Sequence, residues 1–133
     1  MSGSRSRTKG HDWEREIVRD MTESRSTPYT TSRQSRPDLD ARGVDVFSFQ
    51  DPFIIQAKVG KAPRVRAALR EVVGAVDGLA AVVPVAAIRW NRGNGMEKDD
   101  VAVLRWADFL NLIQYVHAPR ERPDILSTSE DGL

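Results

Sequence analysis

Three polar residues in one apolar stretch of this sequence have the types needed for metal-assisted chemistry on a phosphodiester. The stretch GVDVFSFQDPFIIQAK, residues 43–58, places Asp45 between two valines and puts Gln56 and Lys58 in a second apolar run. Such groups are costly to bury without partners, so they are either paired structurally or part of a site. Carboxylate and amide oxygens suit a hard cation such as Mg²⁺, and a lysine beside the ion can hold a water or offset phosphate charge.

Two expected strands position these groups. Residues 43–49 and 53–59 have the composition of strands joined by a short turn, which predicts an antiparallel hairpin. Side chains alternate along a strand, so Gln56 and Lys58 share one face. The register of the hairpin then decides whether Asp45 lies close to Gln56.

A fourth candidate, Glu14, lies on an expected helix over residues 10–23. Glu14 shares a helix face with the apolar residues Ile17, Val18 and Met21. A carboxylate on the inward side of an amphipathic helix is unusual. We therefore expect Glu14 to reach the same cation from the helix above the sheet.

Taken singly, each of these residues also has a structural explanation. Asp45 alone is explained as a turn or pairing carboxylate, and Gln56 alone as a satisfied core amide. Lys58 alone is explained as a strand-end lysine that extends to solvent, and Glu14 as an ion-pair partner of Arg19 or Lys58. One shared site explains all four residues at once.

The remaining sequence predicts a single α/β domain with a mixed sheet flanked by helices. A polar loop with a short strand around Tyr29 is expected before the hairpin. The hairpin is followed by a helix from Pro63 to about Leu79 and a buried strand over residues 81–90, and these two segments could also form an interface. A strand over residues 101–105 and a helix over 106–117, with Trp106, Leu110, Ile113 and Val116 inward, complete the order.

The predicted domain boundaries leave a segment at each end. Residues 1–9 are expected to form a flexible basic arm, residues 10–117 the domain, and residues 118–133 a polar, disordered tail. No apolar run approaches the ~18 residues of a membrane span, and the first residues have no apolar segment of a secretory signal. The chain has no cysteine, which excludes a disulfide scaffold and thiolate metal sites.

The charge of the chain is unevenly distributed. The first 70 residues carry 14 Lys and Arg against 9 Asp and Glu, and the remainder carries 6 against 10. The basic half holds the candidate site, which favours a polyanion partner, although solvated loop arginines explain the same count. No zinc finger, RNP aromatic pair or helix-turn-helix spacing is visible, which favours recognition of shape or backbone over base edges.

Two motifs resemble a known nuclease family. Asp45 followed by Gln56-Ala57-Lys58 resembles the PD-(D/E)XK signature of restriction-endonuclease-like nucleases, in which the second acid can be glutamine. Lys9-Gly10, three further residues and Glu14-Arg15 resemble the KGxxxER opening of archaeal-type Holliday-junction resolvases. The resemblance covers residues 8–75 and implies a restriction-endonuclease-like core of the type α-β-β-β-α-β.

The resemblance also implies a role for each matching residue. Glu14 and Asp45 would be metal ligands for Mg²⁺ or Mn²⁺, Gln56 would supply an amide oxygen, and Lys58 would assist the attacking water or the transition state. Arg15 would contact the DNA backbone or the active-site phosphate. The set expected at the DNA consists of Lys9, Arg15, Ser32, Arg33, Arg36, Lys61, Arg64 and Arg66.

Two positions depart from the family pattern. Val44 precedes Asp45 where the signature has a proline, and this proline is often replaced. Gln56 stands where the archaeal enzymes have a glutamate, which removes one negative charge and would either weaken metal binding or favour one metal ion over two. Asp38 and Asp40 are the acids expected to compensate, although Arg36-Pro37-Asp38 also has the sequence of an ordinary turn.

The predicted function is therefore that of a divalent-metal-dependent DNA endonuclease, a Holliday-junction resolvase that makes paired nicks near the branch. Its partners would be a four-way DNA junction and a second copy of the chain in a homodimer, with no membrane and no organic cofactor. The resemblance places it in the cytoplasm of a prokaryotic or phage-infected cell. Two alternatives remain: a flap, single-strand or RecB-like nuclease of the same fold, and a DNA-binding module with weak or lost catalysis.

Overall fold

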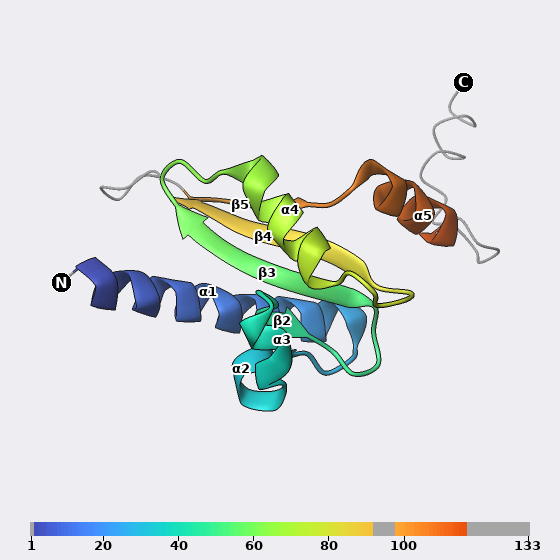
Figure 1. Cartoon of the computed structure of the whole chain (residues 1–133), viewed down its shortest axis with the longest axis horizontal. Coiled ribbons are helices and arrows are strands. Elements are labelled where there is room, and N and C mark those ends of the chain that lie inside the picture. Colours follow the sequence, from blue (N-terminus) through green and yellow to red (C-terminus); the bar gives the residue numbers. More distant parts are fainter. Residues whose placement is uncertain (1, 92–97, 117–133) are drawn as a thin grey trace, which may run out of the picture.

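Two apolar runs form parallel strands at the centre of a mixed sheet, with a helix on each face (Figure 1). The structure is a computed structural model that describes residues 2–91 and 98–116, with side chains from 9 to 91 and from 98 to 114. Within these residues, five strands form one sheet in the order β1-β2-β3-β4-β5. Their bounds are β1 Thr30–Thr31, β2 Val46–Phe47, β3 Phe53–Gly60, β4 Val83–Asn91 and β5 Lys98–Val103.

The predicted α/β class and mixed sheet are confirmed. β3 and β4 pair in parallel, and the other neighbouring strands pair antiparallel. Parallel strands need a crossover, which α4 (Val65–Ala75) provides. The predicted hairpin of β2 and β3 is antiparallel as expected, but its first strand is only two residues long.

The first helix, α1 (Ser2–Arg25), is longer than predicted at both ends. The prediction of a flexible arm over residues 1–9 is therefore wrong from Ser2 onward. The packed segment around Trp13 and Ile17 anchors the helix, and extending an existing helix adds a hydrogen bond for each residue that it fixes. Arg and Lys, which are frequent in the arm, are good helix formers.

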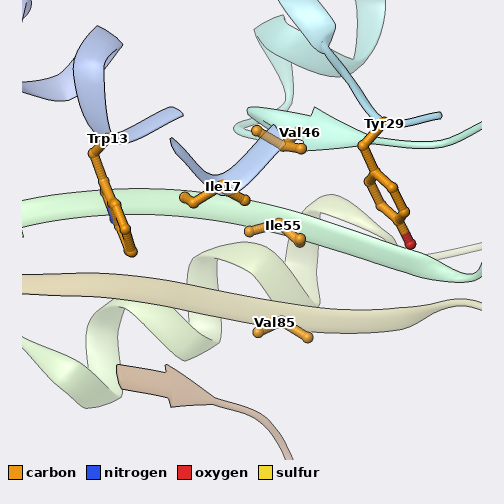
Figure 2. Close-up of a cluster of buried hydrophobic side chains, with 6 residues drawn as sticks. All are labelled: Trp13, Ile17, Tyr29, Val46, Ile55 and Val85. Carbon is orange, nitrogen blue, oxygen red and sulfur yellow. The ribbon is translucent and has the colours of Figure 1, made fainter. Parts of the chain in front are cut away.

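The face of the sheet that α1 covers contains the main apolar cluster (Figure 2). Its buried members are Trp13, Ile17, Tyr29, Val46, Ile55 and Val85. The indole Nε1 of Trp13 also donates a hydrogen bond to the carbonyl oxygen of Ala87 at 3.0 Å. Burial of each large apolar side chain contributes about 1.5–3 kcal/mol, so this cluster fixes α1 against β3 and β4.

The opposite face of the sheet is covered by α4. Ala68 and Val72 of this helix pack on Ala86 and Ile88 of β4, and Val72 and Ile88 are fully buried. The helix after Pro63 and the strand over residues 81–90 therefore belong to the core of the chain. Because β3 alternates, the face that carries Ile54, Gln56 and Lys58 is the face beneath α4.

The segment predicted as a polar loop before the hairpin contains two short helices, α2 (Ser32–Ser35) and α3 (Pro37–Ala41). Pro37 suits the first turn of α3, and Leu39 anchors that helix by burial. The short strand expected near Tyr29 is present as β1, at Thr30–Thr31. These elements place α2 beside the start of β2, where Ser32 N–H donates to the carbonyl oxygen of Asp45 at 2.8 Å.

The last described helix, α5 (Trp106–Val116), stands apart from the α1 and α4 layers (Figure 1). Its side toward the sheet carries Asp108, Asn111 and Leu112, which line a pocket of about 520 Å³ at the N-terminal ends of β3 and β4. The prediction that Trp106, Leu110 and Ile113 point inward is therefore wrong, and these residues are exposed. No helix among the described residues is both long and apolar enough to cross a membrane. The predicted tail, residues 118–133, lies outside the described residues.

Candidate functional site

The start of β2 and the middle of β3 bring Asp45 and Gln56 together. Val46 is opposite Ile55 in this antiparallel pair, which places Asp45 opposite Gln56. The backbone agrees, because the N–H of Asp45 donates to the carbonyl oxygen of Ile55 at 2.9 Å. Opposite residues of an antiparallel pair are side-chain neighbours, so the hairpin has the register that a shared site requires.

The side chain of Asp45 accepts a hydrogen bond from β3 at a position that β2 does not pair with. Its Oδ2 accepts a hydrogen bond from the backbone N–H of Ala57 at 2.7 Å. The carboxylate thus fills the place of a strand carbonyl at the edge of β3, and this contact fixes its orientation. The other carboxylate oxygen, Oδ1, is the one that can serve as a ligand.

The environment of Asp45 disfavours its charged form. Burial is the largest cause that raises the pKa of Asp45 to about 6, and the negative charges of Glu14 and Asp40 act in the same direction. The N–H of Ala57 and the ammonium of Lys58 oppose this shift. Two acids therefore add to the effect of burial on Asp45, a setting in which a bound cation would relieve repulsion.

Glu14, the candidate acid of the first helix, lies on α1. Its side chain is only 13% exposed, and its Oε1 accepts a hydrogen bond from Arg33 Nε at 3.2 Å. Its charge acts on Asp45, which places the two carboxylates in one electrostatic neighbourhood. The partner is Arg33 of α2, whereas the structural explanation from the sequence expected Arg19 or Lys58.

Gln56 is buried, with 5% of its surface exposed, and uses only one end of its amide. Nε2 donates to Oε2 of Glu71 on α4 at 3.0 Å. Oε1 is buried and has no hydrogen-bond partner in the part of the chain that the structure describes. Buried polar atoms are nearly always satisfied, so this oxygen is a candidate ligand atom.

Gly43 lies next to the amide nitrogen of Gln56. Its φ of +96° lies in the left-handed region, where side chains are strained. A Cβ at this position would lie 3.3 Å from Gln56 Nε2. The absence of a side chain at Gly43 therefore lets the chain turn into β2 and leaves room for the amide.

Lys58 and Glu71 form an ion pair beneath α4. Lys58 Nζ lies 3.0 Å from Glu71 Oε2, the oxygen that also accepts from Gln56. The ammonium of Lys58 is the main cause that lowers the pKa of Glu71. Sequence reasoning missed Glu71, although it sits one position before the apolar residue Val72 on the helix that returns over the same strand face.

The acids expected to compensate for Gln56 lie elsewhere. Asp38 is paired with Arg36, whose guanidinium lowers the pKa of Asp38 to about 2. Asp40 acts on Asp45 through its charge. The acid in direct contact with Gln56 is Glu71.

The predicted DNA contacts fall into two groups. Ser32 is fully buried and its hydroxyl donates to the carbonyl oxygen of Val44, so its prediction as a DNA contact is wrong and its role is to hold α2 on β2. Arg33 is engaged with Glu14, Arg15 pairs with Asp12, and Arg36 pairs with Asp38. Lys9, Lys61, Arg64 and Arg66 are exposed.

Two small depressions carry the exposed basic residues next to the site. One of about 250 Å³ is lined by Lys58, Arg64 and Glu71, among others. The other, of about 140 Å³, lies at the end of β3 and is lined by Lys9, Lys61 and Asn91 together with Val59 and Gly60. A basic surface thus extends from Lys58 along the C-terminal end of β3.

The candidate residues carry donor atoms of the types that a hard divalent cation takes. Glu14 and Asp45 supply carboxylate oxygens, and the unpartnered Oε1 of Gln56 supplies an amide oxygen. No group of three or more His, Cys, Asp or Glu residues that could hold a metal occurs within residues 9–91 and 98–114.

Comparison of the chain with protein-family models, with curated proteins and with solved structures finds no match. The interpretation of the site therefore depends on its own geometry. That geometry consists of a half-buried acid opposite a buried amide, a second acid on α1, and a lysine on the same strand as the amide.

Proposed function

We propose that this chain is a divalent-metal-dependent DNA endonuclease with a restriction-endonuclease-like core, and that it resolves four-way DNA junctions. The observation that carries the proposal is the buried, unpartnered Oε1 of Gln56 opposite Asp45. Leaving such an oxygen unsatisfied costs about 1–3 kcal/mol, which a cation ligand would recover. The raised pKa of Asp45 is a second sign of a functional site.

The order and pairing of the elements support the proposed core. The first helix lies on one face, the β2–β3 hairpin follows, and α4 crosses the other face to a parallel β4. This order corresponds to the α-β-β-β-α-β type when β1, β2 and β3 are taken as its three consecutive strands, with the short helices α2 and α3 inserted between β1 and β2. Each predicted site residue then lies on the element that the resemblance to the resolvases implies: Glu14 on the first helix, Asp45 at the hairpin, and Gln56 and Lys58 on the next strand.

In this proposal Glu14, Asp45 and Gln56 hold one Mg²⁺ or Mn²⁺. When bound, the ion polarises the phosphodiester and lowers the pKa of a coordinated water. In the hydrolysis a water oxygen forms a bond to phosphorus while the bond from phosphorus to the leaving sugar oxygen breaks. One proton leaves the attacking water and one is delivered to the leaving oxygen.

The lysine of the site acts on the developing charge. Lys58 extends from the same strand face as Gln56, and 41% of its side chain is exposed, so a phosphate can approach its ammonium. A fixed cation beside a phosphate oxygen stabilises charge in the transition state more than in the ground state. Glu71 holds this ammonium at the site in the absence of DNA.

The basic depressions next to the site supply contacts to the DNA backbone in this proposal. Lys61 and Lys9 lie beyond the end of β3, and Arg64 lies at the start of α4. Contacts of this kind bind phosphates without reading sequence. They suit an enzyme that recognises the shape of a branched DNA.

We further propose that two copies act together as a homodimer. A four-way junction has two symmetry-related strands to cut, and two-fold dimers are the commonest closed assembly. The exposed apolar residues of α5 support a protein contact there, since Trp106 is 70% exposed and Phe109, Leu110 and Ile113 lie beside it. Sedimentation velocity of the wild type and of Trp106→Ser tests this point, with a dimer expected for the first and a monomer for the second.

The experiment that tests the function is cleavage of a labelled four-way junction in Mg²⁺, Mn²⁺ or EDTA. Linear duplex, a flap and a single strand serve as competing substrates, and Asp45→Asn is compared with Asp77→Asn, which changes an exposed acid at the end of α4. Paired, metal-dependent nicks that only Asp45→Asn abolishes would support a resolvase. Preferential cutting of the flap or single strand would support the same site in a flap, single-strand or RecB-like nuclease instead of a resolvase. Junction binding without any cleavage would leave a DNA-binding module.

A further inference from the structure

Gln56 has two chemically different ends, and only one of them can bind a cation. An amide offers an acceptor oxygen at one end and an NH₂ donor at the other. The site therefore works only if something in the structure turns the oxygen toward Asp45 and the nitrogen away. A carboxylate, which is the same at both ends, has no such requirement.

Glu71 meets this requirement. Its Oε2 lies 3.0 Å from Gln56 Nε2, and a carboxylate accepts hydrogen bonds but does not donate them. The NH₂ end of Gln56 must therefore face α4. The open space at Gly43, where a Cβ would lie 3.3 Å from Nε2, accommodates the same orientation. What remains is the buried Oε1, which has no partner within the described chain.

The same oxygen of Glu71 also pairs with Lys58 at 3.0 Å. One carboxylate thus fixes the amide and the ammonium relative to each other, although they lie two residues apart on β3. The contact is partly open to solvent, since 53% of the Glu71 side chain is exposed. Burial of the helix around it keeps Glu71 in place, because the next residue, Val72, is fully buried.

We propose that Glu71 is a positioning residue that orients the Gln56 amide so that its oxygen, and not its nitrogen, faces the cation. This inference rests on the proposed metal site and explains how a neutral glutamine serves where the resolvases carry an acid. Glu71 also places a negative charge near the site, where Gln56 has replaced an acid, without being a ligand of the ion. Groups that orient metal ligands in this way contribute about 10–100-fold to metal affinity.

The test is a double-mutant cycle read by Mn²⁺ binding, measured by titration calorimetry on the full chain without DNA. With Gln56 present, Glu71→Ala should raise the dissociation constant roughly 10–100-fold. In the Gln56→Glu background the same change should leave the dissociation constant unchanged or lower it. The two oxygens of a carboxylate at position 56 are equivalent, so its orientation needs no partner. The substitution also removes the repulsion between that carboxylate and Glu71. The loss of affinity caused by Glu71→Ala should therefore disappear or reverse when residue 56 is a glutamate.

The controls separate this role from others. Glu23→Ala removes an exposed acid from the end of α1 and should leave Mn²⁺ affinity unchanged within about twofold. Melting curves in EDTA verify that each variant folds. In ¹⁵N spectra of Glu71→Ala, the NH₂ signals of Gln56 should show more than one environment for the amide.

Three results would decide against the inference. An equal loss in both backgrounds would make Glu71 a direct ligand or a general source of charge. An absence of any effect in the Gln56 background would reduce it to an ion-pair partner of Lys58. Absence of Mn²⁺ binding by the wild type would overturn the metal site itself, and the role of Glu71 with it.

Discussion

The carboxylate of Asp45 takes the place of a backbone carbonyl in the sheet, because its Oδ2 accepts the N–H of Ala57 at 2.7 Å. One contact therefore serves two purposes. It satisfies the edge of β3 just before the start of β2, and it holds an acid opposite Gln56 in a setting that disfavours its charge. This relationship makes the stability of the fold and the proposed chemistry depend on the same side chain.

The first prediction concerns stability as a function of pH in the metal-free protein. The pKa of Asp45 is raised from 3.8 to about 6, so the folded chain retains a proton that the unfolded chain releases. The free energy of unfolding should fall as pH rises from about 4 to 6, by about 2–3 kcal/mol at ~1.4 kcal/mol per pKa unit. Asp45→Asn should be more stable than the wild type above pH 6 and equal to it at pH 4, in urea melts with EDTA.

Asp77→Asn is the control for this comparison and should not change the pH dependence. If Asp45→Asn is less stable than the wild type at pH 7, the hydrogen bond to Ala57 outweighs the cost of the buried charge. The view of Asp45 as a destabilised functional acid would then be wrong.

The second prediction concerns the coupling of two carboxylates. The charge of Glu14 contributes to the raised pKa of Asp45, but burial is the larger cause. Glu14→Gln should therefore lower the pKa of Asp45 partway toward its usual value. Carboxyl ¹³C titration by NMR in EDTA would measure it. An unchanged pKa would mean that Glu14 is too far from Asp45 to share a cation.

The third prediction concerns the glycine that precedes β2. Gly43→Ala places a side chain at a φ of +96°, which should cost about 1–3 kcal/mol, and brings its Cβ to 3.3 Å from Gln56 Nε2. Mn²⁺ affinity should fall together with stability, because the amide is displaced. Calorimetry and thermal melts measure the two effects.

Gly74→Ala is the matched control, since Gly74 lies in α4 with open space around its Cβ position. It should stabilise the chain by about 0.5–1 kcal/mol and leave Mn²⁺ affinity unchanged. A loss of affinity in both variants would point to general destabilisation rather than displacement of Gln56.

The fourth prediction concerns the chemical step. Lys58→Met removes the charge and leaves an unbranched side chain one atom shorter, and it should lower the rate of junction cleavage by about 10²–10³. Binding of the junction in EDTA should weaken only slightly, because Lys61 and Arg64 remain. Single-turnover rates and gel-shift affinities separate the two. A large loss of binding with a normal rate would make Lys58 a DNA contact instead.

The sequence by itself determined the elements with strong periodicity and the residues that could share a site. The apolar stripe of α1, the runs of β3 and β4 and the hairpin turn are local patterns, and the turn also predicts that the two strands beside it pair. Asp45, Gln56 and Lys58 stood out because polar groups in apolar runs need partners. The hairpin register then confirmed that Asp45 faces Gln56.

Only the tertiary structure decided which groups from distant segments complete the site. Glu71 contacts Gln56 and Lys58 because α4 crosses back over β3. The local sequence around an exposed helical glutamate does not predict such a contact. Ser32 was expected at the DNA but is buried, since α2 folds against β2. The inward face of α5 was also predicted wrongly, because Trp106, Leu110 and Ile113 are exposed. In each case the local pattern fixes the periodicity of an element, while the packing of elements far apart in sequence fixes which side chains meet.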